Sequence, residues 1–444
     1  MNAPISEFVR AYEKNGGLRM HMPGHKGMYG ALSALDITEI AGADELYADE
    51  GIISESQQNA AALFGSRLTL YSTEGSSLCI RAMVYLALLE ARRRGRAPVL
   101  LAARNCHKAF LSALAHTGMD AQWLWSEKDD GIVSCSVTPG ALRRALKARK
   151  TKPAGVYVTS PDYLGRLQDI AGLSRVCREA DVPLLVDNAH GAYLRFLKED
   201  LHPLSLGADL CCDSAHKTLP ALTGAAYLHI SKAAPEGFTQ NARRAMALFA
   251  SSSPSYLTLI SLDECNVLLE EEFPSQLYAL CTHLAALKQR LRARGYALTG
   301  AEPLKLSIHA KPYGYSGGGL HALLRARGIE AEFSDPDFLT FMPSPIQGEE
   351  ALSRLEEALM SVSKAPAIDT CPPPAPRPER VLSVREALLN PAQEVSAKEA
   401  LGRVFVWGHV SCPPCVPILA PGERVDEEAL RCFQYYGVSH IQVL

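Results

Sequence analysis

Short, unbroken runs of apolar residues alternate with longer stretches of helical periodicity between about residues 56 and 230. The runs are short enough for strands that are buried inside a sheet, whereas segments such as 140–150 and 173–181 are typical of helices. The predicted strands are residues 97–104, 155–160, 182–188, 208–214 and 224–230. Strands and helices in alternation predict crossover units, and therefore an α/β fold on a parallel or mostly parallel sheet.

The pattern changes beyond about residue 251. Residues 268–295 have a helical period that we expect to break near Pro274, and residues 304–310 predict a strand. Closely spaced prolines then predict an extended connector. We therefore expect an N-terminal segment (1–55), a large domain (56–250), a small α+β domain (251–364), a proline-rich linker (365–381) and a C-terminal subdomain (382–444).

Composition narrows the class of protein. The 444 residues suffice for two or three domains, and a net charge of −3 gives no electrostatic case for nucleic acid. The basic run at residues 91–96 closes a helical pattern, where cations are favoured. The N-terminus does not have the pattern of a signal peptide, and no apolar window is long enough for a membrane span. Scattered cysteines favour buried, reduced thiols, so we expect a cytoplasmic protein without a membrane partner.

Polar side chains follow four of the predicted strands. Ligands of doubly wound sheets bind beyond the carboxyl ends of the strands, so four such ends predict one site. The residues at these ends are Arg104, Asn105 and His107, then Ser160, Asp162 and Tyr163, then Asp187 and His190, and finally Ser214, His216 and Lys217.

An aspartate and a lysine on neighbouring strands match the needs of pyridoxal 5′-phosphate. This cofactor needs a lysine amine for its aldehyde, an acid for its pyridine nitrogen and a cup for its phosphate. Gly75, Ser76 and Ser77 lie where a turn enters a predicted helix, and a helix N-terminus favours a phosphate. The same three residues would also suit an ordinary N-cap.

Six motifs, in chain order, resemble those of the bacterial ornithine/lysine/arginine decarboxylases, which have the aspartate-aminotransferase fold (fold type I). They are HMPGHKG, RNCHKAF, DNAHGAY, DSAHKTLPALTG, SSSPSY and GYSG. The resemblance extends to about residue 440 and implies a pyridoxal-phosphate-binding large domain followed by a small α+β domain. The chain is most similar to the short subgroup, which lacks a receiver-like N-terminal domain.

The resemblance also implies roles for individual residues. Lys217 would be the Schiff-base lysine, Asp187 the partner of the ring nitrogen and His107 the side chain stacked on the ring. His190 would lie beside the ring, near the lysine. The phosphate would be held by Ser76, Ser77, Ser214 and His216, with Ser253 and Ser255 able to reach a phosphate across a dimer interface.

Several positions depart from the family pattern or leave an alternative open. Asn188 and Tyr193 stand where many relatives have Glu and a second His, which leaves the choice of substrate open. The sequence CPPC, with Cys412 and Cys415, would suit a redox pair or half of a zinc site near His409, although packing in a proline turn is favoured. No metal site is predicted.

We therefore expect pyridoxal-phosphate-dependent decarboxylation of arginine, lysine or ornithine, with arginine slightly favoured, to a polyamine precursor and carbon dioxide. Glu330, Glu332 and Asp335 are candidates for binding the distal cation of the substrate, or form a solvated edge. The resemblance implies a homodimer or a dimer-based assembly, with each site completed by the partner. An aminotransferase or lyase of the same fold, and a non-catalytic homologue, remain alternatives.

Overall fold

The computed structural model describes residues 1–127, 131–408 and 415–444. The chain forms two compact units. The first comprises Met1–Ala97, Thr151–Tyr157 and Ile170–Ser275, and the second comprises Pro98–Lys150, Val158–Asp169 and Gln276–Leu444. Among the described residues, none of the helices combines the length and the apolar character that crossing a bilayer requires.

The seven strands of the largest sheet confirm the predicted α/β class. β5 pairs with β6 and β2 with β3 in parallel, whereas β7 runs antiparallel to β1 and β6. In sheet order, the strands are β1 (Leu68–Ser72), β7 (Ala226–Ile230), β6 (Leu210–Asp213), β5 (Leu184–Asp187), β4 (Pro153–Thr159), β2 (Ala97–Ala103) and β3 (Asp120–Leu124). All five predicted strands are present, and the two that the apolar runs did not predict, β1 and β3, are the edges.

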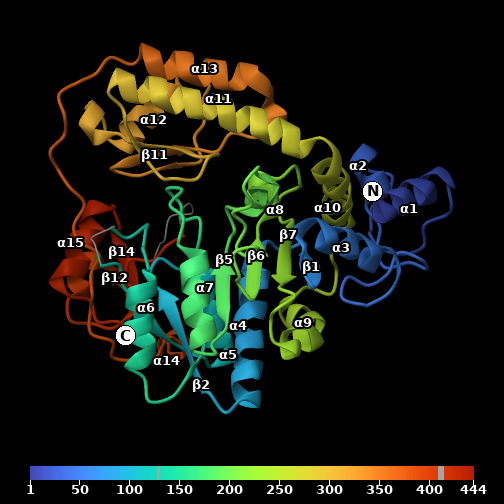
Figure 1. Ribbon diagram of the computed structural model, residues 1–444, viewed down its shortest axis with the longest axis horizontal. Coiled ribbons are helices and arrows are strands. Elements are labelled where there is room, and N and C mark those ends of the chain that lie inside the picture. Colours follow the sequence, from blue (N-terminus) through green and yellow to red (C-terminus); the bar gives the residue numbers. More distant parts are fainter. Residues whose placement is uncertain (128–130, 409–414) are drawn as a thin grey trace. The chain divides into compact units, whose positions relative to one another are not determined.

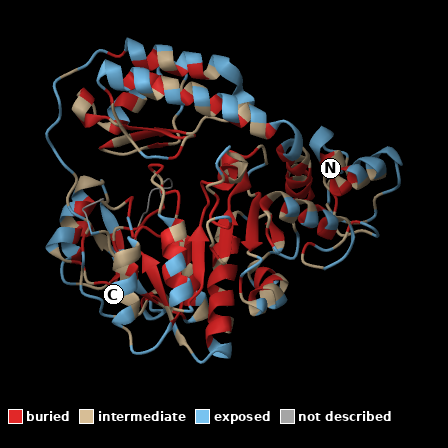
Figure 2. Cartoon of the chain, in the orientation of Figure 1, coloured by how far each residue is buried: buried red, intermediate tan, exposed pale blue. Residues whose placement is uncertain are grey.

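Helix α4 (Ser76–Arg93) is the central helix of the first unit. It is rich in leucine and alanine, is buried along most of its length, and packs against α9 (Glu236–Phe249) and against β6 and β7 (Figures 1 and 2). At its C-terminal end Arg93 and Arg94 bind the carboxylate of Glu90, so the basic run is a helix end, as predicted. The other helices of this unit are α1 (Pro4–Lys14), α2 (Ala31–Leu35), α3 (Gly51–Phe64), α7 (Ile170–Glu179), η1 (Ala192–Phe196), α8 (Ala215–Thr218) and α10 (Tyr256–Glu271).

The second unit contains two smaller antiparallel sheets. One has the order β10 (Phe333–Ser334), β11 (Phe338–Phe341), β9 (Leu306–His309), β8 (Ala297–Thr299), and the other β12 (Gln393–Ser396), β14 (His440–Val443), β13 (Phe405–Gly408). Helix α11 (Phe273–Arg294) starts just after α10 ends, which confirms the break expected near Pro274. The remaining helices are α5 (Lys108–Thr117), α6 (Pro139–Lys147), η2 (Lys311–Tyr313), α12 (Gly317–Arg325), η3 (Pro345–Gln347), α13 (Gly348–Ser361), α14 (Val384–Leu389), η4 (Ala397–Ala400) and α15 (Glu427–Tyr435).

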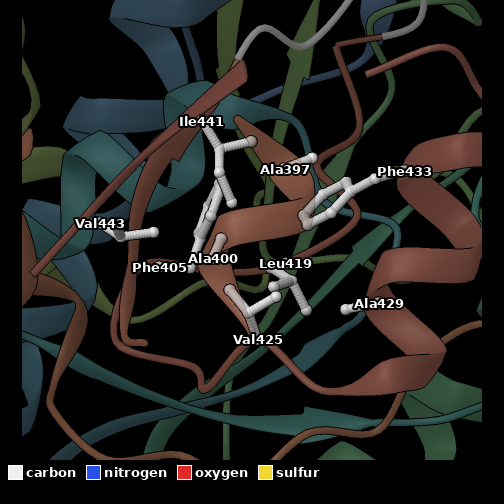
Figure 3. Packing of buried hydrophobic residues seen from close by; sticks show 9 residues of the cluster. All are labelled: Ala397, Ala400, Phe405, Leu419, Val425, Ala429, Phe433, Ile441 and Val443. Carbon is white, nitrogen blue, oxygen red and sulfur yellow. The ribbon is translucent and has the colours of Figure 1, made fainter. Parts of the chain in front are cut away.

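The C-terminal end of the chain has an apolar core of its own. Phe405 on β13, Phe433 on α15 and Ile441 on β14 converge there with smaller side chains (Figure 3). Strand β14 alternates, so that Ile441 and Val443 point into this core while His440 and Gln442 are exposed. Residues 363–379, which precede this part of the chain, contain no helix or strand.

Candidate active site

The ends of β5 and β6 carry the two residues on which the sequence prediction depends. Asp187 is the last residue of β5 and lies beside Cys212 of the parallel strand β6. The chain leaves β6 through Ser214 and forms the single turn α8, which carries Lys217. The Nζ atom of Lys217 lies 3.0 Å from Nε2 of His190, so the structure brings these two predicted residues into contact.

Asp187 is a buried carboxylate with specific donors. Its Oδ2 accepts a hydrogen bond of 3.1 Å from the Tyr157 hydroxyl, and its Oδ1 accepts one of 3.2 Å from the backbone N–H of Ala189. Burial raises the pKa of Asp187 above its ordinary range, while the positive charge of Lys217 lowers it. A nearby cation stabilises the ionised form of such a buried carboxylate, and a protonated pyridine nitrogen is a cation of this kind.

Tyr157 was missed by the sequence analysis. It lies in the predicted strand GVYVTS, where an aromatic residue is an ordinary core residue, and it is fully buried. The one feature of the sequence that could have identified Tyr157 was its hydroxyl in a strand predicted to be buried, because a buried hydroxyl requires a hydrogen-bond partner.

The residues of the predicted phosphate cup lie at the first turn of α4. Gly75 precedes the helix with φ +71°, no side chain caps the helix, and a Cβ added at Gly75 would have no atom within 4 Å. The Ser214 hydroxyl donates a hydrogen bond of 2.9 Å to the Ser76 hydroxyl. Ser76 and Ser77 are thus the first helical residues and not the N-cap, and the first N–H groups of the helix have no side-chain cap, which suits an anion.

His216 is oriented by the backbone. Its Nδ1 lies 2.8 Å from the carbonyl oxygen of Ala225, which implies that Nδ1 carries the proton and donates it. Ser255 caps α10, accepting from the N–H of Thr258, and Ser253 is exposed. The N–H of Ser251 donates to the Glu74 carboxylate, so this serine-rich segment adjoins the residue that precedes Gly75.

Other predicted strand-end residues belong to the second unit and are described within it. His107 is the N-cap of α5, and its Nδ1 accepts a hydrogen bond of 3.1 Å from the N–H of Ala109. Its stacking on a cofactor ring stays a prediction. Arg104 donates to the carbonyls of Pro417 and Ile418 and to Glu423, and therefore anchors the C-terminal part of the chain.

The candidates for a distal cation are already engaged in the second unit. Glu330 pairs with His321 and Arg325, and Glu332 accepts from the Tyr163 hydroxyl. Asp335 accepts from two backbone N–H groups of its own turn, and burial raises its pKa to about 6. All three carboxylates thus have partners within the second unit, and of the three only Glu330 is exposed as a solvated edge would require.

Two remaining motifs have local contacts or lie outside the description. His25 pairs with Asp36, and the Lys26 amine donates to the His21 carbonyl, which favours a turn for HMPGHKG. Cys412 and His409 lie outside the described residues, so the redox and zinc interpretations of CPPC are not tested. Cys415 is buried and is not in a disulfide.

The residues of the first unit fit pyridoxal phosphate. An amine, a buried acid and an uncapped helix N-terminus with two hydroxyls form its donor set, and the space next to Gly75 is open. Lys217 would hold the aldehyde carbon, Asp187 the pyridine nitrogen, and Ser76, Ser77 and Ser214 the phosphate.

Comparisons with known proteins agree with this fit. A family model described as "Orn/Lys/Arg decarboxylase, major domain" matches residues 4–308. The chain is 29% identical to the protein YaaO of Bacillus subtilis over 97% of this chain and 93% of that protein. It is 28% identical to an arginine decarboxylase of the same organism, over 96% of this chain and 91% of that protein.

Solved structures show the same fold at lower identity. Lysine decarboxylase A from Pseudomonas aeruginosa has a TM-score of 0.81 at 16% identity, covering 99% of this chain and 80% of that one. The lysine decarboxylase LdcF of Francisella novicida has a TM-score of 0.79 at 16% identity, covering 100% of this chain and 81% of that one. At this identity the likeness shows the fold alone.

Proposed function

Because this chain belongs to the Orn/Lys/Arg decarboxylase family, we propose that it removes the α-carboxylate of a basic amino acid with the aid of pyridoxal phosphate. The observation that carries the proposal is the grouping in one unit of Lys217, in contact with His190, and the buried acid Asp187. Both groups follow neighbouring parallel strands, where ligands of such sheets bind.

The residues of the chain have separate tasks in this reaction. When bound, the cofactor supplies an electron-accepting ring conjugated to the α-carbon of the substrate. Asp187 would keep a proton on the pyridine nitrogen, since its burial makes a nearby cation favourable. His190, whose Nε2 lies 3.0 Å from the Lys217 amine, would exchange a proton with that amine during the reaction.

We propose arginine as the preferred substrate. Support comes from the similarity to an arginine decarboxylase of Bacillus subtilis along 96% of this chain, at an identity that also leaves lysine and ornithine open. The product would be a diamine or agmatine, a precursor of polyamines. We further propose a cytoplasmic enzyme that works as a homodimer or a dimer-based assembly, an expectation that rests on the family resemblance.

A substrate panel tests the proposal directly. The purified protein is incubated with pyridoxal phosphate and with arginine, lysine or ornithine, and both carbon dioxide and keto acid are measured. We expect carbon dioxide in an equimolar amount with the amine product, and no keto acid. Keto acid as the main product would identify an aminotransferase instead.

Two variants complete the test. Lys217→Ala should abolish turnover and the covalent binding of the cofactor, which is followed by absorbance. Lys232→Ala is the matched control, because Lys232 is an exposed lysine of the same unit, and it should change neither. A Lys217→Ala protein that still turns over would contradict the assignment of the lysine.

A further inference from the structure

A second buried carboxylate lies next to the candidate site. Asp213 ends β6 directly before Ser214 and is completely buried. Its Oδ1 accepts 2.7 Å from the Asn188 amide nitrogen and faces the Cys211 sulfur at 3.4 Å. On the other side, Nε2 of His202 lies 2.9 Å and Nε2 of His229 3.3 Å from its Oδ2. Four polar side chains thus converge on one carboxylate.

The protons around Asp213 can be assigned from the outer contacts. Nδ1 of His202 accepts from the N–H of Leu204, so its Nε2 carries the proton and donates it to Asp213. The Asn188 amide and the Cys211 thiol can act only as donors toward a carboxylate. Burial alone would raise the pKa of Asp213, but the two histidines hold it well below its usual range. Asp213 is therefore an ionised group whose two oxygens accept hydrogen bonds from His202, Asn188 and Cys211.

This carboxylate connects the two turns that carry His190 and Lys217. Asn188 directly follows Asp187, its N–H donates 3.0 Å to the Cys212 carbonyl, and its own carbonyl accepts 2.8 Å from Gly191. The bond from the Asn188 side chain to Asp213 is a third attachment of this turn. On the other side, the residue after Asp213 is Ser214, whose carbonyl accepts from the N–H of Lys217.

The Asn188 side chain is committed to this task. Its Oδ1 is buried and has no hydrogen-bond partner among the described residues, so its only bond is the one to Asp213. The amide at this position therefore faces the interior of the unit. A second carboxylate here would face Asp213 without a donor between them, which like-charge repulsion disfavours.

A bound metal would be another use for these side chains. Ligand atoms of His202, Cys211 and Asp213 lie within 4.8 Å of one another. However, the thiol and the imidazole approach opposite oxygens of Asp213, and both act as donors to it. Burial also raises the pKa of Cys211 well above its ordinary value, whereas a metal requires the thiolate. The hydrogen-bonded carboxylate accounts for all of these contacts.

We propose that Asp213 is a positioning residue: through Asn188 it fixes the turn of His190 against Lys217, and so sets the reactivity of the Lys217 amine. The inference deepens the proposed function, because that amine is the group that would bind the cofactor. It concerns the amine itself, however, so it can be tested on the cofactor-free chain.

The first measurement is the reductive methylation of Lys217 by formaldehyde and a borohydride, followed by peptide mass spectrometry. Lys232 in the same sample serves as the internal reference. Asp213→Asn places an amide opposite the Asn188 amide and removes the negative charge. The rate of methylation at Lys217 should therefore fall by about tenfold, the effect of losing one charge-assisted hydrogen bond. The rate of covalent binding of pyridoxal phosphate should fall by a similar factor.

Three further variants separate positioning from simple destabilisation. The double variant Asn188→Asp/Asp213→Asn exchanges the two side chains and so restores an acid–amide pair. It should bring the rates of methylation and of cofactor binding back to within about threefold of the wild type. Asn188→Leu removes only the bond to Asp213 and should reproduce the effect of Asp213→Asn, even where Asp213→Asn itself does not fold. Asp263→Asn alters another buried carboxylate of the same unit, and it should shift the melting temperature and leave both rates unchanged.

Three results would overturn the proposal. The first is a set of Asp213→Asn and Asn188→Leu proteins with lowered melting temperatures and wild-type rates at Lys217. The second is an exchange variant that recovers neither rate. The third is one equivalent of tightly bound zinc, found by elemental analysis, whose removal reproduces the Asp213→Asn effect. Loss of decarboxylase activity from the wild type would instead refute the proposed function and leave the methylation result interpretable.

Discussion

Nζ of Lys217 and Nε2 of His190 lie 3.0 Å apart, although 27 positions separate the two residues in the sequence. The contact exists because β5 and β6 are parallel neighbours, and each is followed by a tight turn at the same end of the sheet. A ring nitrogen at this distance is within hydrogen-bonding reach of the amine and can exchange a proton with it during the reaction. Proton exchange between the two groups depends on this distance, and therefore on the positions of both turns.

Replacing His190 should slow the enzyme without unfolding it. His190→Ala removes the proton acceptor beside Lys217, and we expect kcat to fall by about 10²-fold or more, the usual contribution of one general base. His190→Gln can accept a hydrogen bond but cannot take a proton, so it should recover little of the loss. Steady-state kinetics with the preferred substrate measures both, and a His190→Ala enzyme with wild-type kcat would contradict the role.

Asp187 should destabilise the cofactor-free chain at neutral pH. Burial raises its pKa in the folded state, so the folded chain binds this proton more tightly than the unfolded chain. Folding stability is therefore lost as the pH rises from the pKa of Asp187 in the unfolded chain through its pKa in the folded chain. Ionisation of Asp187 in the folded chain at pH 7 is unfavourable. Asp187→Asn should melt at a higher temperature than the wild type without pyridoxal phosphate and at a lower temperature with it. Melting curves with and without cofactor test this reversal.

The hydroxyl of Ser214 should matter only for ligands that carry a phosphate. Ser214→Ala removes one donor beside the first turn of α4, so we expect the Kd for pyridoxal phosphate to rise about tenfold. The Kd for pyridoxal, which lacks the phosphate, should stay the same. Absorbance titrations with both ligands give the comparison. An equal loss for both ligands would indicate general damage to the site and not a phosphate contact.

Asp263 should make the attachment of the N-terminal helix depend on pH. It accepts hydrogen bonds from Ser56 on α3 and from the N–H of Ser6 on α1, and burial raises its pKa to about 6. The folded state prefers the proton, so the unfolding free energy should fall by on the order of 2–3 kcal/mol between about pH 4 and pH 6.

The Asp263→Asn variant should lack that part of the pH dependence. The matched control is Asp49→Asn in the same unit, which alters an exposed pair with Arg243 and should retain the slope. Denaturant titrations of the cofactor-free proteins across this pH range provide the comparison. Parallel profiles for the wild type and Asp263→Asn would show that other groups cause the slope.

The pair of Arg104 and Glu423 should be essential for the second unit. Both side chains are buried and lie 3.2 Å apart, so Glu423→Ala leaves a buried guanidinium without its counter-ion. We expect a loss of about 3–5 kcal/mol in stability. Glu379→Ala breaks an exposed pair with Arg424 and should cost less than about 1 kcal/mol. Equal losses in the two variants, measured by denaturant unfolding, would refute the special role of the buried pair.

The sequence alone was a good guide to the buried strands and a poor one to the edge strands. β5 and β6 are continuous apolar runs, because both of their faces are covered, and they were predicted within two residues of their observed ends. β3 has polar residues at Asp120 and Gln122, since an edge strand needs fewer apolar residues. Its pattern therefore resembled that of a loop.

What the sequence determined by itself was local: apolar runs that form strands, polar residues where these runs end, and a glycine–serine turn entering a helix. This local information was enough to identify three candidate site residues, Asp187, Lys217 and Ser76, because each is defined by its place relative to its own strand or helix. The tertiary structure alone decided which of these groups meet. Tyr157 reaches Asp187, His190 reaches Lys217, and His202 reaches Asp213 through the pairing and packing of segments distant in the chain. Such contacts leave no periodic signal, because strand order and the burial of polar groups are set by the packing of the whole unit.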